Sequence, residues 1–138
     1  MFNVVGQINW LGVAASTFAM AVLGALWFTA FFGKAYTYAL GREGQPPFKM
    51  TPIFMAGPFV CGLVTSIANA VLMRALGIDN FGDGLAYGLI VGIGFLVTTT
   101  VNTGINPNMP RPLLYGAVSG SYFLVAGMVS SFLIVLIR

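Results

Sequence analysis

The stretch GLAYGLIVGIGFLVTTTVNTGI, residues 84–105, decides the fold, because none of its side chains carries a charge. A helix that crosses the hydrocarbon core of a bilayer needs about 20 consecutive apolar residues. Residues 8–32, 52–76 and 110–137 also reach this length, each with at most one charged side chain. The sequence therefore predicts an all-α membrane protein, an antiparallel bundle of four transmembrane helices.

The composition of the whole chain points the same way. Of its 138 residues 58% are hydrophobic and only 7% are charged, whereas soluble domains contain about 25% charged residues. Little sequence lies outside the four stretches, so we expect one membrane domain over residues 1–138. The single cysteine, Cys61, falls inside the second stretch and is interpreted as a small buried apolar side chain.

The net charge of +3 predicts membrane orientation rather than a nucleic-acid partner, because the basic residues are spread over loops and helix ends. Lysine and arginine are enriched in cytoplasmic loops. We therefore expect the first and third loops in the cytoplasm and both termini on the other side. The first and third loops hold Lys34, Arg42, Lys49 and Arg111, against Arg74 and Arg138 on the other side.

Aromatic residues near the ends of the predicted spans indicate contact with the lipid headgroups. Tryptophan and tyrosine are enriched at the membrane–water interface, so Trp10, Trp27 and Tyr36 are predicted to be interfacial anchors. Tyr36 also belongs to a mixed aromatic and basic segment after the first span. Such a segment is typical of a short helix lying at the membrane surface.

Small residues recur at helical spacing and predict the faces through which the helices pack. In a bilayer, helices associate through close contact of small residues and through interhelical hydrogen bonds. Steps of 100° per residue put Thr99 and Asn102 on the glycine side of the third span and turn Val97 and Val101 toward lipid. The predicted packing residues are Gly84, Gly88, Gly92, Gly116, Gly120 and Gly127.

A set of polar residues is predicted to face the interior of the bundle. Ser66 and Asn69 share one side of the second span, as Thr99 and Asn102 do in the third. Because the third loop is short, Asn102 is expected to bond either to Arg111 or to backbone groups freed by Pro107 and Pro110. These groups could hold the helices together or could line a small polar cavity.

The residues that catalysis needs are absent from the predicted spans. The chain contains no histidine, and its acids are Glu43, Asp79 and Asp83, all in loops. General acid–base catalysis needs a group that exchanges protons near neutral pH. We therefore predict no enzyme activity, no catalytic residue, and no cofactor or metal site.

Three segments together resemble the bacterial membrane family catalogued as domain of unknown function 1761. They read INWLGV from residue 8, LGALWFTAFFGKAY from residue 23, and GFLVTTTVNTGINPNMPRPLLYGAVSGSYFLV from residue 94. The matching positions are Asn9, Trp10, Gly24, Trp27, Gly33, Lys34, Gly94, Phe95, Asn102, Arg111 and Pro112. The resemblance implies a multi-pass protein of the bacterial inner membrane and implies no activity.

One departure from the family pattern concerns the end of the first span. The usual Trp-Tyr-Ser-Pro reads Trp-Phe-Thr-Ala at residues 27–30. Because the proline is missing, we expect no sharp helix end near residue 30.

Two interpretations of function follow from these patterns. The first is a structural or accessory subunit of a membrane assembly, formed with copies of itself or with other membrane chains, in contact with membrane lipids. The second is a small channel or carrier for a neutral or anionic solute, with Asn69 and Asn102 as polar lining.

Overall fold

The computed structural model of the chain describes residues 2–137, which contain helices and no strand. Four helical spans are long and apolar enough to cross a membrane: Trp10–Phe31, Pro52–Ala75, Phe81–Gly104 and Pro112–Leu136. The predicted all-helical fold with four spans is confirmed.

Two of the four spans are composite. The elements in chain order are η1 (Phe2–Gln7), α1 (Trp10–Leu26), the π-helix η2 (Trp27–Phe31), α2 (Gly33–Ala39), α3 (Pro52–Ala75), α4 (Phe81–Val91), the π-helix η3 (Gly92–Val97), α5 (Thr98–Gly104) and α6 (Pro112–Leu136). The first span joins α1 to η2, and the third joins α4, η3 and α5.

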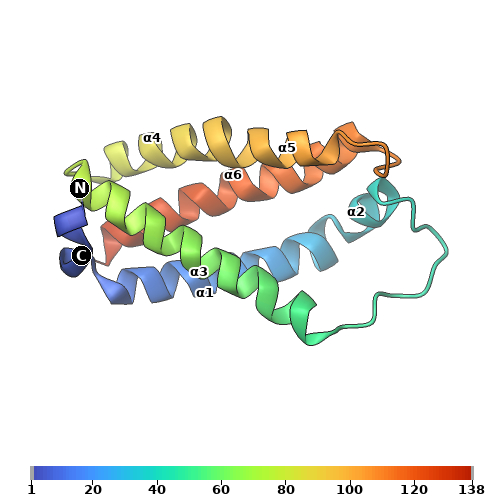
Figure 1. Ribbon diagram of the computed structural model, residues 1–138, viewed down its shortest axis with the longest axis horizontal. Coiled ribbons are helices and arrows are strands. Elements are labelled where there is room, and N and C mark those ends of the chain that lie inside the picture. The colour runs from blue at the N-terminus through green and yellow to red at the C-terminus, as the bar shows by residue number, and fades with distance from the viewer. Residues whose placement is uncertain (1, 138) are drawn as a thin grey trace.

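The helix α6 occupies the centre of the arrangement. It lies between α1 and the line formed by α4, η3 and α5, while α3 lies across α1 (Figure 1). Of the four spans α6 is the most buried and α3 the least. The chain ends lie at one end of the bundle with the 76–80 turn, and α2 lies at the opposite end with the segments 40–51 and 105–111 (Figure 1).

Capping residues set the observed helix starts. The side chain of Asn9 accepts a hydrogen bond of 2.9 Å from the Leu11 N–H, which satisfies a donor at the start of α1. Its amide also donates to the carbonyl of Ile137 and thereby joins the first and last spans. Asn80 caps α4 in the same way, so the third span begins at Phe81, three residues earlier than the sequence predicts.

The expectation that no sharp helix end occurs near residue 30 is wrong. The first span ends at Phe31, Phe32 has the non-helical φ of −122°, and α2 then begins at Gly33. A Cβ atom at Gly33 would lie 3.2 Å from the Phe28 carbonyl oxygen. A glycine, rather than a proline, therefore permits this tight junction.

The π-helix η3 changes which residues of the third span face the bundle. A π turn holds one residue more than an α turn, so the residues after it rotate by about 100°. Thr99 and Asn102 are consequently exposed, and the prediction that they face the interior is wrong. Val97 and Val101, predicted to face lipid, instead approach Gly120 and Gly116 of α6.

Candidate functional site

A buried network of polar side chains joins all four spans in the half of the bundle nearer the chain termini. The Ser16 hydroxyl of α1 lies 2.8 Å from the Ser66 hydroxyl of α3 and donates to Ser130 of α6 at 2.7 Å. Asn69 of α3 donates to Ser130 at 3.0 Å and accepts a 3.1 Å hydrogen bond from the Tyr87 hydroxyl of α4. We call these five residues the polar network.

Each member of the polar network finds its partners inside the chain. All five side chains are buried, with Ser16, Ser66 and Ser130 fully inaccessible. The Ser66 hydroxyl also lies 3.7 Å from the sulfur of Met20, as a donor to it. Buried polar groups without partners are costly, so this closure makes the network a tie between helices.

The polar network contains two of the predicted interior residues and also a tyrosine that was not predicted. Ser66 and Asn69 are buried members, whereas Thr99 and Asn102 lie outside the bundle. Tyr87 was absent from the candidates. Helical steps place Tyr87 about 100° from Gly88, at the edge of the glycine side of α4, so the spacing gave no clear signal for it.

Two of the clustered threonines of the third span form hydrogen bonds within that span. The Thr98 hydroxyl donates to the Gly94 carbonyl at 2.8 Å, and the Thr100 hydroxyl donates to the Leu96 carbonyl at 2.7 Å. Such i−4 bonds satisfy a hydroxyl without any partner helix.

The six predicted packing glycines are buried and lie where the third span meets α6. A Cβ atom at Gly84 would lie 2.9 Å from the Val135 side chain, and one at Gly92 would lie 3.0 Å from Leu124. On α6, a Cβ atom at Gly127 would lie 3.6 Å from the Gly88 carbonyl oxygen. The absence of side chains therefore sets the close approach of these two spans.

The three predicted anchors occupy different environments. Trp10 is 57% exposed at the start of α1. Trp27 is half-buried, and its indole N–H donates to the Val118 carbonyl at 3.0 Å, so it joins η2 to α6 instead of standing free at the surface. Tyr36 is half-buried with its ring 4.7 Å from that of Phe28. Burial, and then the hydroxyl of Tyr115, raise the pKa of Tyr36.

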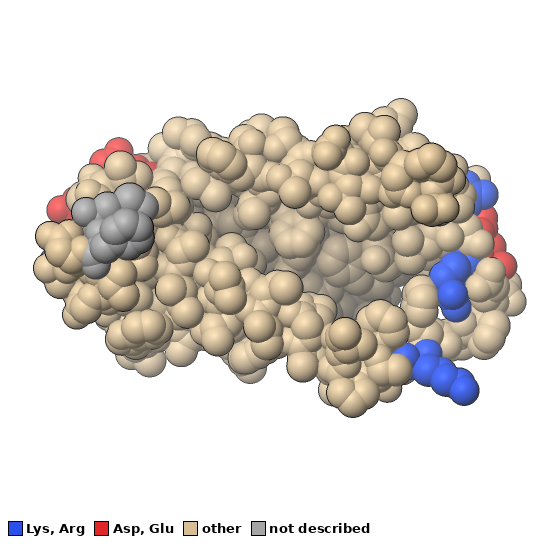
Figure 2. Space-filling view, viewed as in Figure 1, with Lys and Arg blue, Asp and Glu red and all other residues tan. Residues whose placement is uncertain are grey.

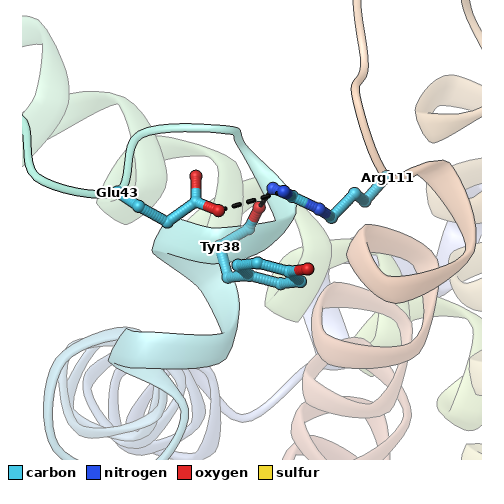
Figure 3. Close-up of polar contacts among 3 residues, drawn as sticks. All are labelled: Tyr38, Glu43 and Arg111. Carbon is cyan, nitrogen blue, oxygen red and sulfur yellow. Dashed lines mark hydrogen bonds and ion pairs between the residues drawn. The ribbon is translucent and has the colours of Figure 1, made fainter.

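Arg111 clamps the end of the bundle that carries α2 (Figure 3). Its guanidinium donates to the Tyr38 carbonyl, lies 3.5 Å from the centre of the Tyr38 ring, and forms a 3.0 Å ion pair with Glu43. Arg111 immediately precedes α6 and is half-buried. The prediction that it belongs to the interior and bonds to Asn102 is therefore wrong, because the 33–43 segment reaches it first.

The clamp is expected to open in acid. A hydrogen bond from the backbone of Glu43 to its own carboxylate holds the pKa of Glu43 below the usual 4.5. Desolvation raises this pKa, and the Arg111 guanidinium lowers it further. A carboxyl with a lowered pKa stabilises the fold fully above its usual pKa and loses that contribution as pH falls through the lowered value. The hydrogen-exchange protection factors of residues 33–43, which correct for the pH dependence of the intrinsic exchange rate, should therefore fall as the Glu43 carboxylate is protonated. Arg111→Gln should remove the part of this pH dependence that comes from the ion pair and leave the part that comes from the Glu43 backbone hydrogen bond. A pH profile that Arg111→Gln does not change at all would contradict the assignment.

Two hollows lie at the ends of the bundle, and neither is lined by a member of the polar network. One of about 690 Å³ lies beside η2 and α2, and one of about 440 Å³ lies where Gln7 and Arg74 meet. Within residues 2–137, no three His, Cys, Asp or Glu side chains come together as metal ligands would.

Residues 11–135 match the family described as "Protein of unknown function (DUF1761)", so the chain belongs to that family. The match leaves out Asn9 and Trp10 and covers nearly all of the four spans. No curated protein and no solved structure matches the chain.

Proposed function

We propose that this member of the DUF1761 family is a structural or accessory subunit of an assembly in the bacterial inner membrane. The helix α3 packs against a membrane helix of a partner chain, in the simplest case α3 of a second copy. The chain acts by binding and positioning rather than by catalysis.

The outward face of α3 is the observation that carries this proposal. Gly57, Cys61 and Ala68 lie within roughly 40° of one another and roughly 140° to 180° from Ser66, the residue that faces the bundle. No atom would come within 4 Å of a Cβ atom at Gly57, and Cys61 and Ala68 are exposed. Lipid does not require small residues, whereas close contact between membrane helices does.

The exposure of Cys61 also corrects its interpretation as a buried side chain. The first half of α3 packs weakly on the rest of the chain: Ile53 is 73% exposed and Met55 is 65% exposed, and the buried residues of α3 begin at Ser66. A helix held along half its length leaves the other half available to a partner.

The polar interior supports a structural role over transport. Asn102 was one of the two residues expected to line a solute path, and it is turned away from the bundle, as is Thr99. The other expected lining residue, Asn69, is hydrogen-bonded to Ser130 and Tyr87, and its neighbour Ser66 is hydrogen-bonded to Ser16. A solute would have to break these bonds in order to pass.

The distribution of charge supports the proposed orientation, with both termini outside the cytoplasm. The 32–51 and 105–111 connections, which contain Lys34, Arg42, Lys49 and Arg111, lie together at the α2 end (Figure 1). Basic side chains visible in Figure 2 also gather at this end. The cytoplasmic side normally holds such residues.

Oxidative cross-linking in native membranes tests the proposed partner. In a two-fold symmetric contact the residues nearest the symmetry axis meet their own copies. In a contact centred on the outward face of α3, Cys61 is such a residue. A disulfide forms when the two Cα atoms lie within about 7 Å. We expect Cys61 to give a covalent dimer, and Cys61→Ser to abolish it. Cys61→Ser with Ile90→Cys, a 67% exposed position on α4, is the matched control and should not cross-link.

Equal cross-linking from Ile90→Cys would show random collision and would contradict the α3 interface. Absence of any covalent product from Cys61 would contradict self-association through this face.

A further inference from the structure

The hollow beside α2 combines charged, hydroxyl and apolar groups at one membrane boundary. It occupies about 690 Å³ and is lined by Phe28, Thr29, Lys34, Thr37, Tyr38 and Glu43, among others. Phe28 and Thr29 belong to η2, the last turn of the first span, whereas Lys34, Thr37 and Tyr38 belong to α2. The hollow therefore runs from the membrane-spanning segment to the headgroup level.

The polar half of the hollow carries an uncompensated positive charge. Glu43 is the acid at this end of the described chain, and its carboxylate is engaged by Arg111 at 3.0 Å. Lys34 forms no ion pair within residues 2–137. Thr37, one turn further along the same face of α2, offers an exposed hydroxyl beside it.

The other half of the hollow is apolar and rigid. The Phe28 ring is held between the rings of Tyr36 at 4.7 Å and Tyr122 at 5.1 Å. Thr29 contributes apolar surface, because its hydroxyl is taken up by the Ala25 carbonyl at 2.5 Å. A ligand for this hollow needs an anionic group next to an apolar chain.

We propose that this hollow binds the headgroup of an anionic phospholipid. The phosphodiester meets the Lys34 ammonium and the Thr37 hydroxyl, and the start of an acyl chain lies against Phe28. Four basic side chains against one acidic one at this end favour an anionic lipid over a zwitterionic one. This inference holds whether or not the chain assembles with a partner.

The hollow at the opposite end lacks this chemistry. Its basic residue, Arg74, already donates to the Gln7 side chain at 3.2 Å. The 76–83 segment nearby adds Asp79 and Asp83, which repel an anionic headgroup. The two ends of the bundle therefore differ in the lipid that they favour.

Lipid titration of the full-length protein in mild detergent, followed by native mass spectrometry, tests the site. Phosphatidylglycerol and phosphatidylcholine with identical acyl chains are the probes, with inorganic phosphate in a separate arm. We expect tighter binding of phosphatidylglycerol, and no displacement of it by millimolar phosphate, since the apolar wall contributes. Lys34→Gln should weaken phosphatidylglycerol binding about fivefold, the ratio that corresponds to one basic residue near an anionic lipid.

Lys49→Gln is the matched control, because Lys49 lies at the same end but does not line the hollow. It should change the affinity by less than Lys34→Gln does, and Lys34→Arg should retain binding. Equal effects of Lys34→Gln and Lys49→Gln would show a general charge attraction and overturn the site. Equal binding of the two lipids, or displacement by phosphate alone, would overturn the ligand. Thermal unfolding of Lys34→Gln should match that of the unaltered protein, because Lys34 is exposed.

Discussion

Replacing Gly88 with leucine is expected to lower the free energy of unfolding by an amount at the upper end of about 1 to 3 kcal/mol. A Cβ atom at this position would overlap the Ser131 hydroxyl and would lie 3.0 Å from the Met128 Cα atom. The second contact is with backbone, so α4 and α6 would have to separate. Thermal unfolding in mild detergent should show a large fall in the melting temperature.

Gly62→Ala provides the matched control for this prediction. Nothing lies within 4 Å of a Cβ atom at Gly62, and alanine is favoured over glycine inside a helix by about 1 kcal/mol. Gly62→Ala should therefore be neutral or stabilising, and Ile93→Leu, at a 52% exposed position, should be nearly silent. Equal melting temperatures for Gly88→Leu and Ile93→Leu would contradict the close contact of α4 with α6.

Replacing Asn69 with leucine is expected to have the second largest effect. Leucine removes the acceptor of the Tyr87 hydroxyl and a donor to Ser130, and it leaves the Tyr87 hydroxyl buried without its partner. Leaving such a buried group unsatisfied costs about 1 to 3 kcal/mol. The melting temperature should fall, and hydrogen exchange should rise in α3 and α4 together, because Asn69 joins these two helices.

The same substitution at Asn102 serves as the control, because Asn102 is exposed on α5. Asn102→Leu should leave the melting temperature nearly unchanged. If Asn102→Leu destabilised the protein as strongly as Asn69→Leu, the rotation of the third span after η3 would be wrong.

The predicted faces of the helices hold as long as the helix is regular. Ser66 and Asn69 in α3, and Gly84 and Gly88 in α4, lie where steps of 100° place them, because no π turn precedes them in their spans. Thr99 and Asn102 follow the π-helix η3, whose extra residue shifts everything after it. Gly92 and Gly94 were visible in the sequence, but hydrophobic periodicity alone does not show where a wide turn forms.

Contacts between segments distant in sequence account for the other differences. Arg111 and Glu43 are 68 positions apart, and only the folded chain brings them within 3.0 Å. Trp27 is of a residue type that is common at the membrane interface, yet its indole N–H donates a hydrogen bond to the Val118 carbonyl of α6. The type of a residue indicates the environments in which it can lie. Which of these environments Arg111 and Trp27 occupy depends on how α2 and α6 pack in the folded chain.

The mass of the particle extracted from the native membrane into polymer nanodiscs tests the central proposal most directly. If the chain is a subunit of an assembly, the particle contains more than one copy of it, or one copy with other membrane chains. In the first case, substituting leucine for Gly57 should reduce the particle to one copy. A particle that contains a single chain surrounded by lipid, at native expression level and with its four spans folded, would contradict the proposal.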